Sequence, residues 1–433
     1  MNLKPYPSYK DSGVEWIGEI PEGWEVKRLK FLFNSMDYKR VPLSAEMRSD
    51  IEKIYPYYGA SGIIDFVDNY LFDEPLLLVA EDGANLLSRS TPLAFIANGK
   101  YWVNNHAHIL KPLAGPLIYW EGVMQSYDYT PIISGSAQPK LTAENLREIP
   151  LPTPQKEEME TISAFLDHHT DRIDTLISKN RRLIDLLKEK RAALINHTVT
   201  KGLDPDAKMK DSGVEWIGEI PEEWEVHKLK RLLLPGNNGM KMGPFGSQLK
   251  LEIMAKRGNK VYGQENVINN NFKLGERFID EEKFKELRVY EIFPGDIVIS
   301  TMGTVGNCRI VPVNIDRGIM DSHLIRMRVN SLIINQFFSL ILNDSSYLFY
   351  NLIKSSKGSI MTGLNSEIIS NLLLVLPPLE IQEEILRYLN RKTALIDKEI
   401  SLVKKKIKLL EEYRKSLIHH VVTGKVDVRG VEA

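Results

Sequence analysis

The sequence predicts an α+β (mixed) protein in which two globular domains are joined by two long helices. Residues 10–30 recur at 210–230, and 18 of these 21 positions are identical. Each copy ends in a stretch of about forty residues whose apolar side chains recur every three or four positions. Solenoid repeats span only about 20 to 50 residues, so this longer period indicates two copies of a domain-sized unit. We therefore expect an internal pseudo-twofold repeat.

The two copies agree at their ends and differ in their middles. Residues 194–200 (LINHTVT) match residues 417–423 (LIHHVVT), whereas 31–130 and 231–350 barely match. The matching ends form a common frame, and the two middles are different inserts in it. The expected segments are residues 10–154 for the first globular domain, 155–202 for the first long helix, 210–376 for the second globular domain and 380–425 for the second long helix.

Composition narrows the class of protein without naming a function. A length of 433 residues with 43% hydrophobic residues suits about three globular domains. The sequence has no uninterrupted apolar run of about 18 residues, so no membrane span is expected. The single cysteine, Cys308, excludes an internal disulfide and fits a reducing cytoplasm. The net charge is −1, so positive charge for binding a polyanion must be local or come from a partner.

The first long helix is expected directly after Pro150, Pro152 and Pro154, because residues 155–201 contain neither proline nor glycine. Apolar residues spaced alternately by four and three indicate a coiled coil of about five heptads. The expected seam comprises Ile162, Leu166, Ile173, Leu176, Leu183, Leu187 and Leu194 in the first helix, and Ile385, Leu389, Ile396, Val403, Leu410, Leu417 and Val421 in the second.

Each helix would be about 60 Å long at 1.5 Å per residue, too long to bury its apolar stripe alone. The simplest partner is the other long helix, and the intervening domain allows either direction. We favour an antiparallel pair because it relates the two copies by a pseudo-twofold axis. Polar residues at His169, Asn180 and Lys190 would then fix the register of the seam, or alternatively contact a partner subunit.

The sequences of the two inserts predict mixed α/β domains. Short apolar runs between turn residues predict strands of four to six residues. In the first insert these runs lie at 63–66, 75–80, 93–96 and 108–110, and in the second a similar run lies at 294–300. Four tryptophans occur at the same places in both copies and suit packing anchors better than base stacking: Trp16, Trp24, Trp216 and Trp224.

None of the loops carries a strong catalytic motif. His106 and His108 lie two apart on an expected strand, so they would point the same way, but a third ligand at metal spacing is missing. Glu81-Asp82 resembles half of a nuclease acid pair, although Asp82-Gly83 is explained better as a turn. Residues 303–306 suit a tight turn, because no GxxxxGK[ST] phosphate loop occurs.

Taken together, these stretches resemble the specificity subunit of type I restriction-modification systems. The resemblance covers nearly the whole chain. Its motifs are the twice-occurring DSGVEWIGEIPE, then YYGASG, LLLVAEDGANL and WVNNHAHIL in the first domain, GPFGSQLK, PGDIVIS and GTVGN in the second, and the proline-led helices beginning QKEEMETI and LEIQEEI.

The resemblance implies a non-catalytic, DNA-binding subunit. Each insert would be a target-recognition domain for one half of a split double-stranded DNA sequence, and unlike inserts predict an asymmetric target. The coiled coil would set the spacer and dock two methylation subunits, and motor/nuclease restriction subunits would join for cleavage. No cofactor, metal or membrane is expected for this chain, whereas S-adenosylmethionine, ATP and Mg are expected on the partner subunits. The sequence indeed lacks the glycine-rich signature that binds the methyl donor and the Asn/Asp-Pro-Pro-aromatic tetrapeptide of an adenine methylase.

Candidate DNA-facing residues lie in loops rich in Gly, Ser and Asn, because such loops allow close backbone approach and Asn, Gln and Lys read base edges. They are Tyr58, Ser61, Asn104, Asn105, His106, Ser136, Gln138 and Lys140 in the first domain, and Ser247, Gln248, Lys250, Ser359, Thr362 and Asn365 in the second. The alternative for each is that it only shapes its loop.

Two rival functions are also compatible with the sequence. An insert could hide a nuclease or methylase, which activity of the purified chain would reveal. The chain could also be a coiled-coil scaffold that binds only proteins, and exchanging single inserts would then leave DNA sequence preference unchanged.

Overall fold

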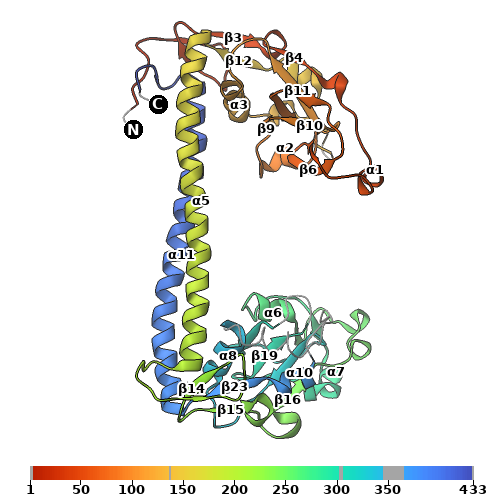
Figure 1. Cartoon of the computed structure of the whole chain (residues 1–433). Helices are drawn as coiled ribbons and strands as arrows, with labels where there is room; N and C mark the ends of the chain where they lie inside the picture. Colours follow the sequence, from red (N-terminus) through yellow and green to blue (C-terminus); the bar gives the residue numbers. More distant parts are fainter. Residues whose placement is uncertain (1–2, 136–137, 302–305, 345–364, 432–433) are drawn as a thin grey trace. The chain divides into compact units, whose positions relative to one another are not determined.

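The computed structural model describes residues 3–135, 138–301, 306–344 and 365–431 (Figure 1). The chain divides into two compact units. The first unit comprises Met1–Arg182 and Val403–Ala433, and the second comprises Leu183–Leu402. Each unit therefore contains one globular domain and one half of each long helix.

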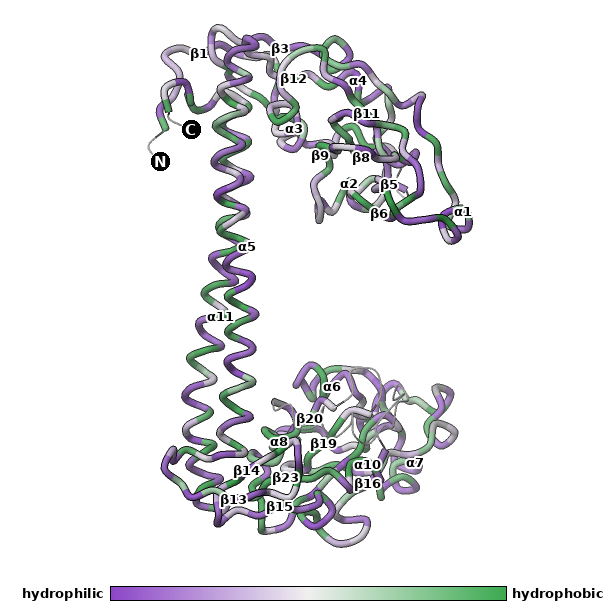
Figure 2. Tube along the Cα trace, in the orientation of Figure 1, coloured by the Kyte–Doolittle hydropathy of each residue, from purple (hydrophilic) through white to green (hydrophobic). Residues whose placement is uncertain are grey.

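The two long helices are α5 (Lys156–Lys201) and α11 (Leu379–Val422). Both begin after proline, and both carry glutamate in the first turn, where the helix dipole favours negative charge. Each ends before a glycine in the left-handed region, Gly202 (φ 83°) and Gly424 (φ 73°). Hydrophobic and hydrophilic positions alternate along both helices (Figure 2).

The helices run antiparallel within the first unit. Asp174 Oδ1 lies 2.9 Å from Arg414 Nε, and about two turns further along α5 Arg181 Nη2 lies 3.0 Å from Glu411 Oε1. Residue numbers thus rise on α5 as they fall on α11. Exposed ion pairs of this kind stabilise by at most about 1 kcal/mol, so they mark the register and apolar packing holds the pair together. The predicted antiparallel direction is confirmed.

In the second unit the same direction follows from packing. Ile195 and Val199, near the end of α5, share a hydrophobic core with Ile385 and Leu389, near the start of α11. The predicted fold class, two mixed domains joined by two long antiparallel helices, is therefore confirmed.

The seam on α5 departs from the predicted heptads at two positions. Leu176 and Leu183 are 43% and 42% exposed, whereas Ile177 and Ile184 are buried, so the prediction was wrong at these leucines. From Ile162 to Thr198 the buried or half-buried positions along one face of α5 are separated by ten intervals, which together cover 36 residues. Its mean step of 3.6 is the period of a straight α-helix, whereas a strict 3.5 repeat requires left-handed supercoiling.

The remaining predicted seam residues are all buried or half-buried. Those that are buried are Ile162, Leu166, Ile173, Leu187, Ile385, Leu389, Ile396, Leu417 and Val421, and those that are half-buried are Leu194, Val403 and Leu410. Of the polar positions, His169 and Asn180 are buried. Lys190 is exposed, and its neighbour Arg191 takes the half-buried position.

The repeated segment builds the same small strands twice. A first hairpin pairs β1 (Tyr9–Asp11) with β2 (Glu19–Pro21), and its copy pairs β13 (Met209–Asp211) with β14 (Glu219–Pro221). The strands that enter and leave each globular domain also pair: β3 (Glu25–Arg28) with β12 (Pro150–Thr153), and β15 (Glu225–Lys228) with β23 (Leu373–Leu376). The ends of each domain are thus fixed together beside the long helices.

Trp24 and Trp224 are buried anchors of this frame, in line with their expected packing role. A Cβ atom on Gly424 would lie 3.2 Å from the Trp24 ring, and one on Gly202 would lie 3.2 Å from the Trp224 ring. The neighbouring lysines act alike, since Lys425 Nζ donates to the Glu19 carbonyl and Lys201 Nζ to the Glu219 carbonyl. The chain order is Lys-Gly in one copy and Gly-Lys in the other.

The two globular domains share one strand order although their sequences barely match. The larger sheets are β4 (Phe33–Ser35), β11 (Ala107–Pro112), β8 (Leu76–Ala80) and β9 (Ala94–Ala97) in the first domain, and β16 (Met240–Met242), β22 (Leu324–Met327), β19 (Ile297–Ser300) and β20 (Cys308–Ile310) in the second. Neighbours in each row are antiparallel.

A second sheet in each domain contains a parallel pair at the same place. Its strands are β6 (Gly62–Val67), β5 (Tyr55–Gly59), β10 (Lys100–Val103) and β7 (Phe72–Asp73) in the first domain, and β18 (Phe278–Ile279), β17 (Asn259–Tyr262) and β21 (Gly318–Met320) in the second. The parallel pairs are β5 with β10 and β17 with β21. The same chain path therefore carries two sets of loops.

Short helices complete the domains. They are α1 (Ala45–Ser49), α2 (Asn85–Ser88), α3 (Leu117–Ser126) and α4 (Ala143–Arg147) in the first, and α6 (Gln264–Ile268), α7 (Glu281–Glu286), α8 (Asn335–Asp344) and α10 (Ser366–Asn371) in the second. Buried Tyr119, Trp120 and Val123 fix α3 to the core of the first unit. Within the described ranges, no helix is long and apolar enough to cross a membrane.

Candidate nucleic-acid interface

Three loops of the first domain meet at one edge of its larger sheet. The Glu81 amide, just after β8, donates to the His106 carbonyl at 2.9 Å, in the connection from β10 to β11. The Leu141 amide donates to the Glu81 carbonyl at 2.7 Å, and the Gly83 amide to the Pro139 carbonyl at 3.1 Å. Backbone hydrogen bonds thus bring segments 81–85, 104–106 and 138–141 together.

Asn104 shapes the central loop. Its amide donates to the Tyr58 carbonyl at 3.0 Å, and its Oδ1 accepts the His106 amide at 2.8 Å. Asn104 itself is only 4% exposed, whereas Asn105 and His106 are exposed. The side-chain-to-backbone bond two residues on defines an Asx turn, which presents the next two residues at the surface.

An acidic side chain lies beside the ring of His106. Its Nδ1 lies 2.8 Å from Asp82 Oδ2, and half of the side chain is exposed. His108, two residues on, is almost fully buried in β11. The expectation that the two histidines point the same way was therefore wrong, because His106 belongs to the turn and only His108 to the strand.

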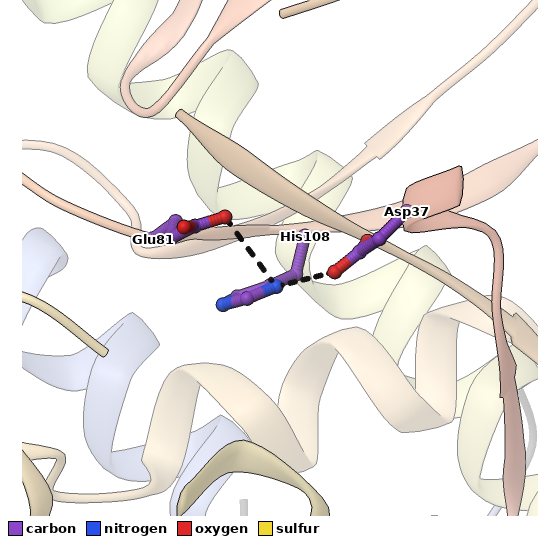
Figure 3. Close-up of side chains that lie close together, drawn as sticks. All are labelled: Asp37, Glu81 and His108. Carbon is purple, nitrogen blue, oxygen red and sulfur yellow. Dashed lines mark hydrogen bonds and ion pairs between the residues drawn. The ribbon is translucent and has the colours of Figure 1, made fainter. Parts of the chain in front are cut away.

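A buried ionic cluster lies beneath this edge (Figure 3). His108 Nδ1 is 2.7 Å from Asp37 Oδ2 and 3.7 Å from Glu81 Oε2. Burial opposes ionisation of Asp37, but hydrogen bonds from His108 and the Ile109 amide hold its pKa below the ordinary value. Burial also opposes ionisation of Glu81, yet the Arg40 hydrogen bond and the charge of His108 hold its pKa below the ordinary value.

Two carboxylates and a histidine could ligate a metal, but this cluster is balanced by protein charges. Arg40 contacts both Glu81 and Asp37, and Lys140 Nζ lies 3.1 Å from Glu81 Oε1. The second ring nitrogen of His108, Nε2, faces the Leu141 carbonyl at 2.9 Å. Both nitrogens of this histidine therefore have acceptor partners, and the cluster is explained as the rigid support of the loops above it.

The second domain builds the same corner with different residues. The Asp321 amide donates to the Tyr262 carbonyl at 2.8 Å, and Asp321 Oδ1 accepts the His323 amide at 2.9 Å. The Thr301 amide, just after β19, donates to the His323 carbonyl at 3.0 Å. Residues 321–323 therefore occupy the place that residues 104–106 occupy in the first domain.

The glycine-rich loop predicted to face DNA begins at this corner. The Gly243 amide donates to the Leu324 carbonyl at 3.0 Å, and a Cβ atom at Gly243 would collide with the Asp321 carbonyl. Only glycine fits so close an approach. Ser247, Gln248 and Lys250 follow in the same loop and are exposed, although Gln248 Oε1 also accepts the Phe245 amide at 3.3 Å.

The other candidate residues differ in their burial and in their contacts. Tyr58 is half-buried, with its ring centroid 5.9 Å from that of Phe95, and burial raises its pKa. Ser61 is exposed at the turn between β5 and β6, and Gln138 and Lys140 are exposed. Asn365 caps α10, since its side chain accepts the Ile368 amide at 2.9 Å. Ser136, Ser359 and Thr362 lie outside the described residues.

Sequence reasoning missed Asp321, Ser322 and His323. Their equivalence to Asn104, Asn105 and His106 rests on backbone pairing with segments about fifty residues earlier, which no local motif reports. One signal was nevertheless present. In both domains an Asn/Asp-x-His triplet stands immediately before an apolar strand.

Comparison with known sequences identifies the family. The sequence model of the type I restriction modification DNA specificity domain matches residues 21–184 and 221–412. The chain belongs to this family. Each match spans one globular domain and most of the long helix that follows it, so the specificity domain is present twice.

Relatives extend over nearly the whole chain. A putative type I restriction enzyme specificity subunit of Haemophilus influenzae is 26% identical, covering 87% of this chain and 90% of that protein. The type I restriction enzyme MjaVIII specificity subunit of Methanocaldococcus jannaschii is 22% identical, covering 95% of both. A chain from a structural study of complex assembly and conformational transition of the type I R-M system, 14% identical, has the same fold, with a TM-score of 0.64 over 94% of this chain and 99% of that one.

Proposed function

We propose that this chain is the non-catalytic specificity subunit of a type I restriction-modification complex and reads a bipartite, asymmetric target on double-stranded DNA. Each globular domain reads one half of that target. The observation that carries the proposal is the duplicated DNA specificity domain, in which one strand order supports two different sets of loops.

The asymmetry rests on the chemistry of equivalent loop positions. Where the first domain presents Asn105, the second has Ser322 at the equivalent position of the turn. Base pairs are distinguished by donors and acceptors in the major groove. Loops with different donors and acceptors therefore favour different bases, so the two half-sites differ.

The long helices set the spacer and dock two methylation subunits. Besides the seam they expose a second apolar set. In the first unit it comprises Leu176, Leu409 and Tyr413, and in the second unit Leu183, Leu186, Leu395 and Leu402. Leu395, Leu402 and Leu409 are spaced by seven residues, the spacing at which one helix packs against another. Exposed leucines at this spacing support a helical partner rather than a solvated face.

Catalysis and cofactors belong to the partner subunits. S-adenosylmethionine is expected on the methylation subunits, and ATP and Mg on the motor/nuclease restriction subunits. Within the described ranges, the acid–histidine group formed by Asp37, Glu81 and His108 is engaged by Arg40 and Lys140. Because its ligand is chromosomal or invading DNA, we place the complex in the cytoplasm.

Exchange of one recognition domain tests the proposal. Residues 29–149 lie between β3 and β12, so the corresponding segment of the Haemophilus influenzae relative can replace them while the frame stays intact. Co-expressed with the methylation subunit, the chimaera is expected to change one half of the methylated motif and keep the other. An unchanged motif, or methyl transfer or DNA cleavage by the purified chain alone, would contradict the proposal.

A further inference from the structure

We propose that His323 is a DNA-contacting residue of the second domain and His106 its counterpart in the first, each touching its own half of the target. This inference rests on the proposed function and adds to it a specific pair of contact residues. It is carried by a turn that the two domains share although their sequences differ.

The turn has the same hydrogen bonds in both domains. Its first residue donates a backbone hydrogen bond to a tyrosine carbonyl, at 3.0 Å for Asn104 and 2.8 Å for Asp321. The side chain of that residue accepts the amide of the histidine two positions on, at 2.8 and 2.9 Å. The histidine carbonyl then accepts an amide from the strand-end residue, Glu81 or Thr301, at 2.9 and 3.0 Å.

These bonds require an Asn or Asp at the first position, but they require no particular side chain at the third. Both first residues are only 4% exposed and serve the turn. At the third position the backbone amide and carbonyl make the bonds, and any residue supplies them. Yet both domains have histidine there, and histidine makes up only 9 of the 433 residues. Packing does not explain it, since the side chains of His106 and His323 are 50% and 47% exposed.

A carboxylate lies beside the same ring nitrogen in both turns. His106 Nδ1 is 2.8 Å from Asp82 Oδ2, and His323 Nδ1 is 3.9 Å from Asp321 Oδ2. Among the described residues, Nε2 of neither ring has a protein partner. With the proton on Nδ1, Nε2 accepts a hydrogen bond, as from the amino group of adenine or cytosine. With both nitrogens protonated, it donates to guanine or to a phosphate.

The surroundings of each histidine suit a nucleic-acid edge. In the first domain Lys140, half exposed, comes from the adjoining loop, and in the second the loop that carries Lys250 starts against the Asp321 backbone. Arg277, one-third exposed, lies 3.0 Å from Asp321 and holds that carboxylate in place. Cations near a polar reader are the usual arrangement, because phosphate contacts position the protein and base contacts specify the sequence.

The test uses the full chain assembled with its methylation subunit and compares wild type, His323→Ala, His106→Ala and, as a control, Ser331→Ala at an exposed position of the second domain. Methylation rates are measured on the target and on all its single-base variants. The half-site that changes when residues 29–149 are exchanged is assigned to the first domain.

We expect His323→Ala to lose about tenfold or more in methylation rate or in base discrimination within the second domain's half-site, with the other half-site unchanged. His106→Ala should give the mirror image, Ser331→Ala should behave as wild type, and His323→Gln should recover part of the loss by restoring a polar atom. Relaxation at one position identifies base readout, and uniform slowing identifies a phosphate contact. Wild-type rates for both alanine variants would overturn the inference and leave the proposed function standing. No bipartite methylation by the wild-type complex would overturn both.

Discussion

His169 shows the effect of a polar side chain in the seam between α5 and α11. It is 7% exposed, its ring centroid lies 4.2 Å from that of Phe165, and its Nε2 is buried without a hydrogen-bond partner. Burial, followed by the charges of His168 and Arg172, lowers the pKa of His169 below its ordinary value of 6.5. The folded protein therefore favours the neutral form of this ring.

Replacing His169 with Leu should raise the free energy of unfolding by about 1 kcal/mol near pH 7.5, because an unpaired buried nitrogen is removed. The gain should grow as the pH falls through 6.5, since the unfolded chain takes up a proton there that the folded chain resists. Urea unfolding at pH 7.5 and 5.5 measures both effects, with exposed His197→Leu as the control. Parallel pH profiles for wild type and His169→Leu would contradict the assignment.

Gly424 tests the frame at the level of one residue. Its φ of 73° disfavours any side chain, and a Cβ atom there would also collide with Pro21 and crowd Trp24. Gly13 has nearly the same φ, 67°, but open space around it. Gly424→Ala should therefore cost about 1 to 3 kcal/mol more than Gly13→Ala in thermal or urea unfolding. Equal losses would show that the contact with the anchor tryptophan contributes nothing.

At the scale of elements, two neighbouring residues on α5 separate stability from docking. Ile177 is buried in the seam, and Leu176 is 43% exposed. Ile177→Ala should cost about 2 to 4 kcal/mol of unfolding free energy through the cavity it leaves. Leu176→Ala should stay within about 0.5 kcal/mol of wild type yet weaken binding of the methylation subunit, measured by calorimetry. The reverse pattern would restore the strict heptad seam and remove the support for docking at Leu176.

The long helices were predictable because the absence of proline and glycine and the apolar spacing both act locally. The phase of the seam was not. A straight helix drifts by about 20° per heptad relative to a strict 3.5 repeat, so the drift of about 40° over the two heptads from Ile162 turns Leu176 outward and brings Ile177 into the seam. The frame was predictable because its sequence occurs twice in the chain. The turn at Asp321 was not, because its partners at Tyr262 and Thr301 are brought to it only by the sheets. Asn104 and His106 were named from loop composition, which does not reveal that Asn104 is buried and His106 is presented.

At the scale of the whole molecule, net charge limits what the chain does alone. A net charge of −1 gives little counterion release from DNA, and that release supplies much of the affinity of DNA-binding proteins. We expect the isolated chain to bind its target weakly at physiological salt and to gain affinity when the methylation subunits are added. Fluorescence anisotropy with labelled target duplex at several salt concentrations measures this. Nanomolar binding by the isolated chain would contradict it.

The two specificity domains of this chain are proposed to read two unlike half-sites. The most direct test of this proposal is single-molecule methylation mapping of DNA from a methylation-free host that expresses this chain with its methylation subunit. We expect new methyladenine in two unlike short motifs at a fixed separation. A soluble complex that leaves the DNA unmethylated, or that methylates a symmetric or undivided motif, would contradict it.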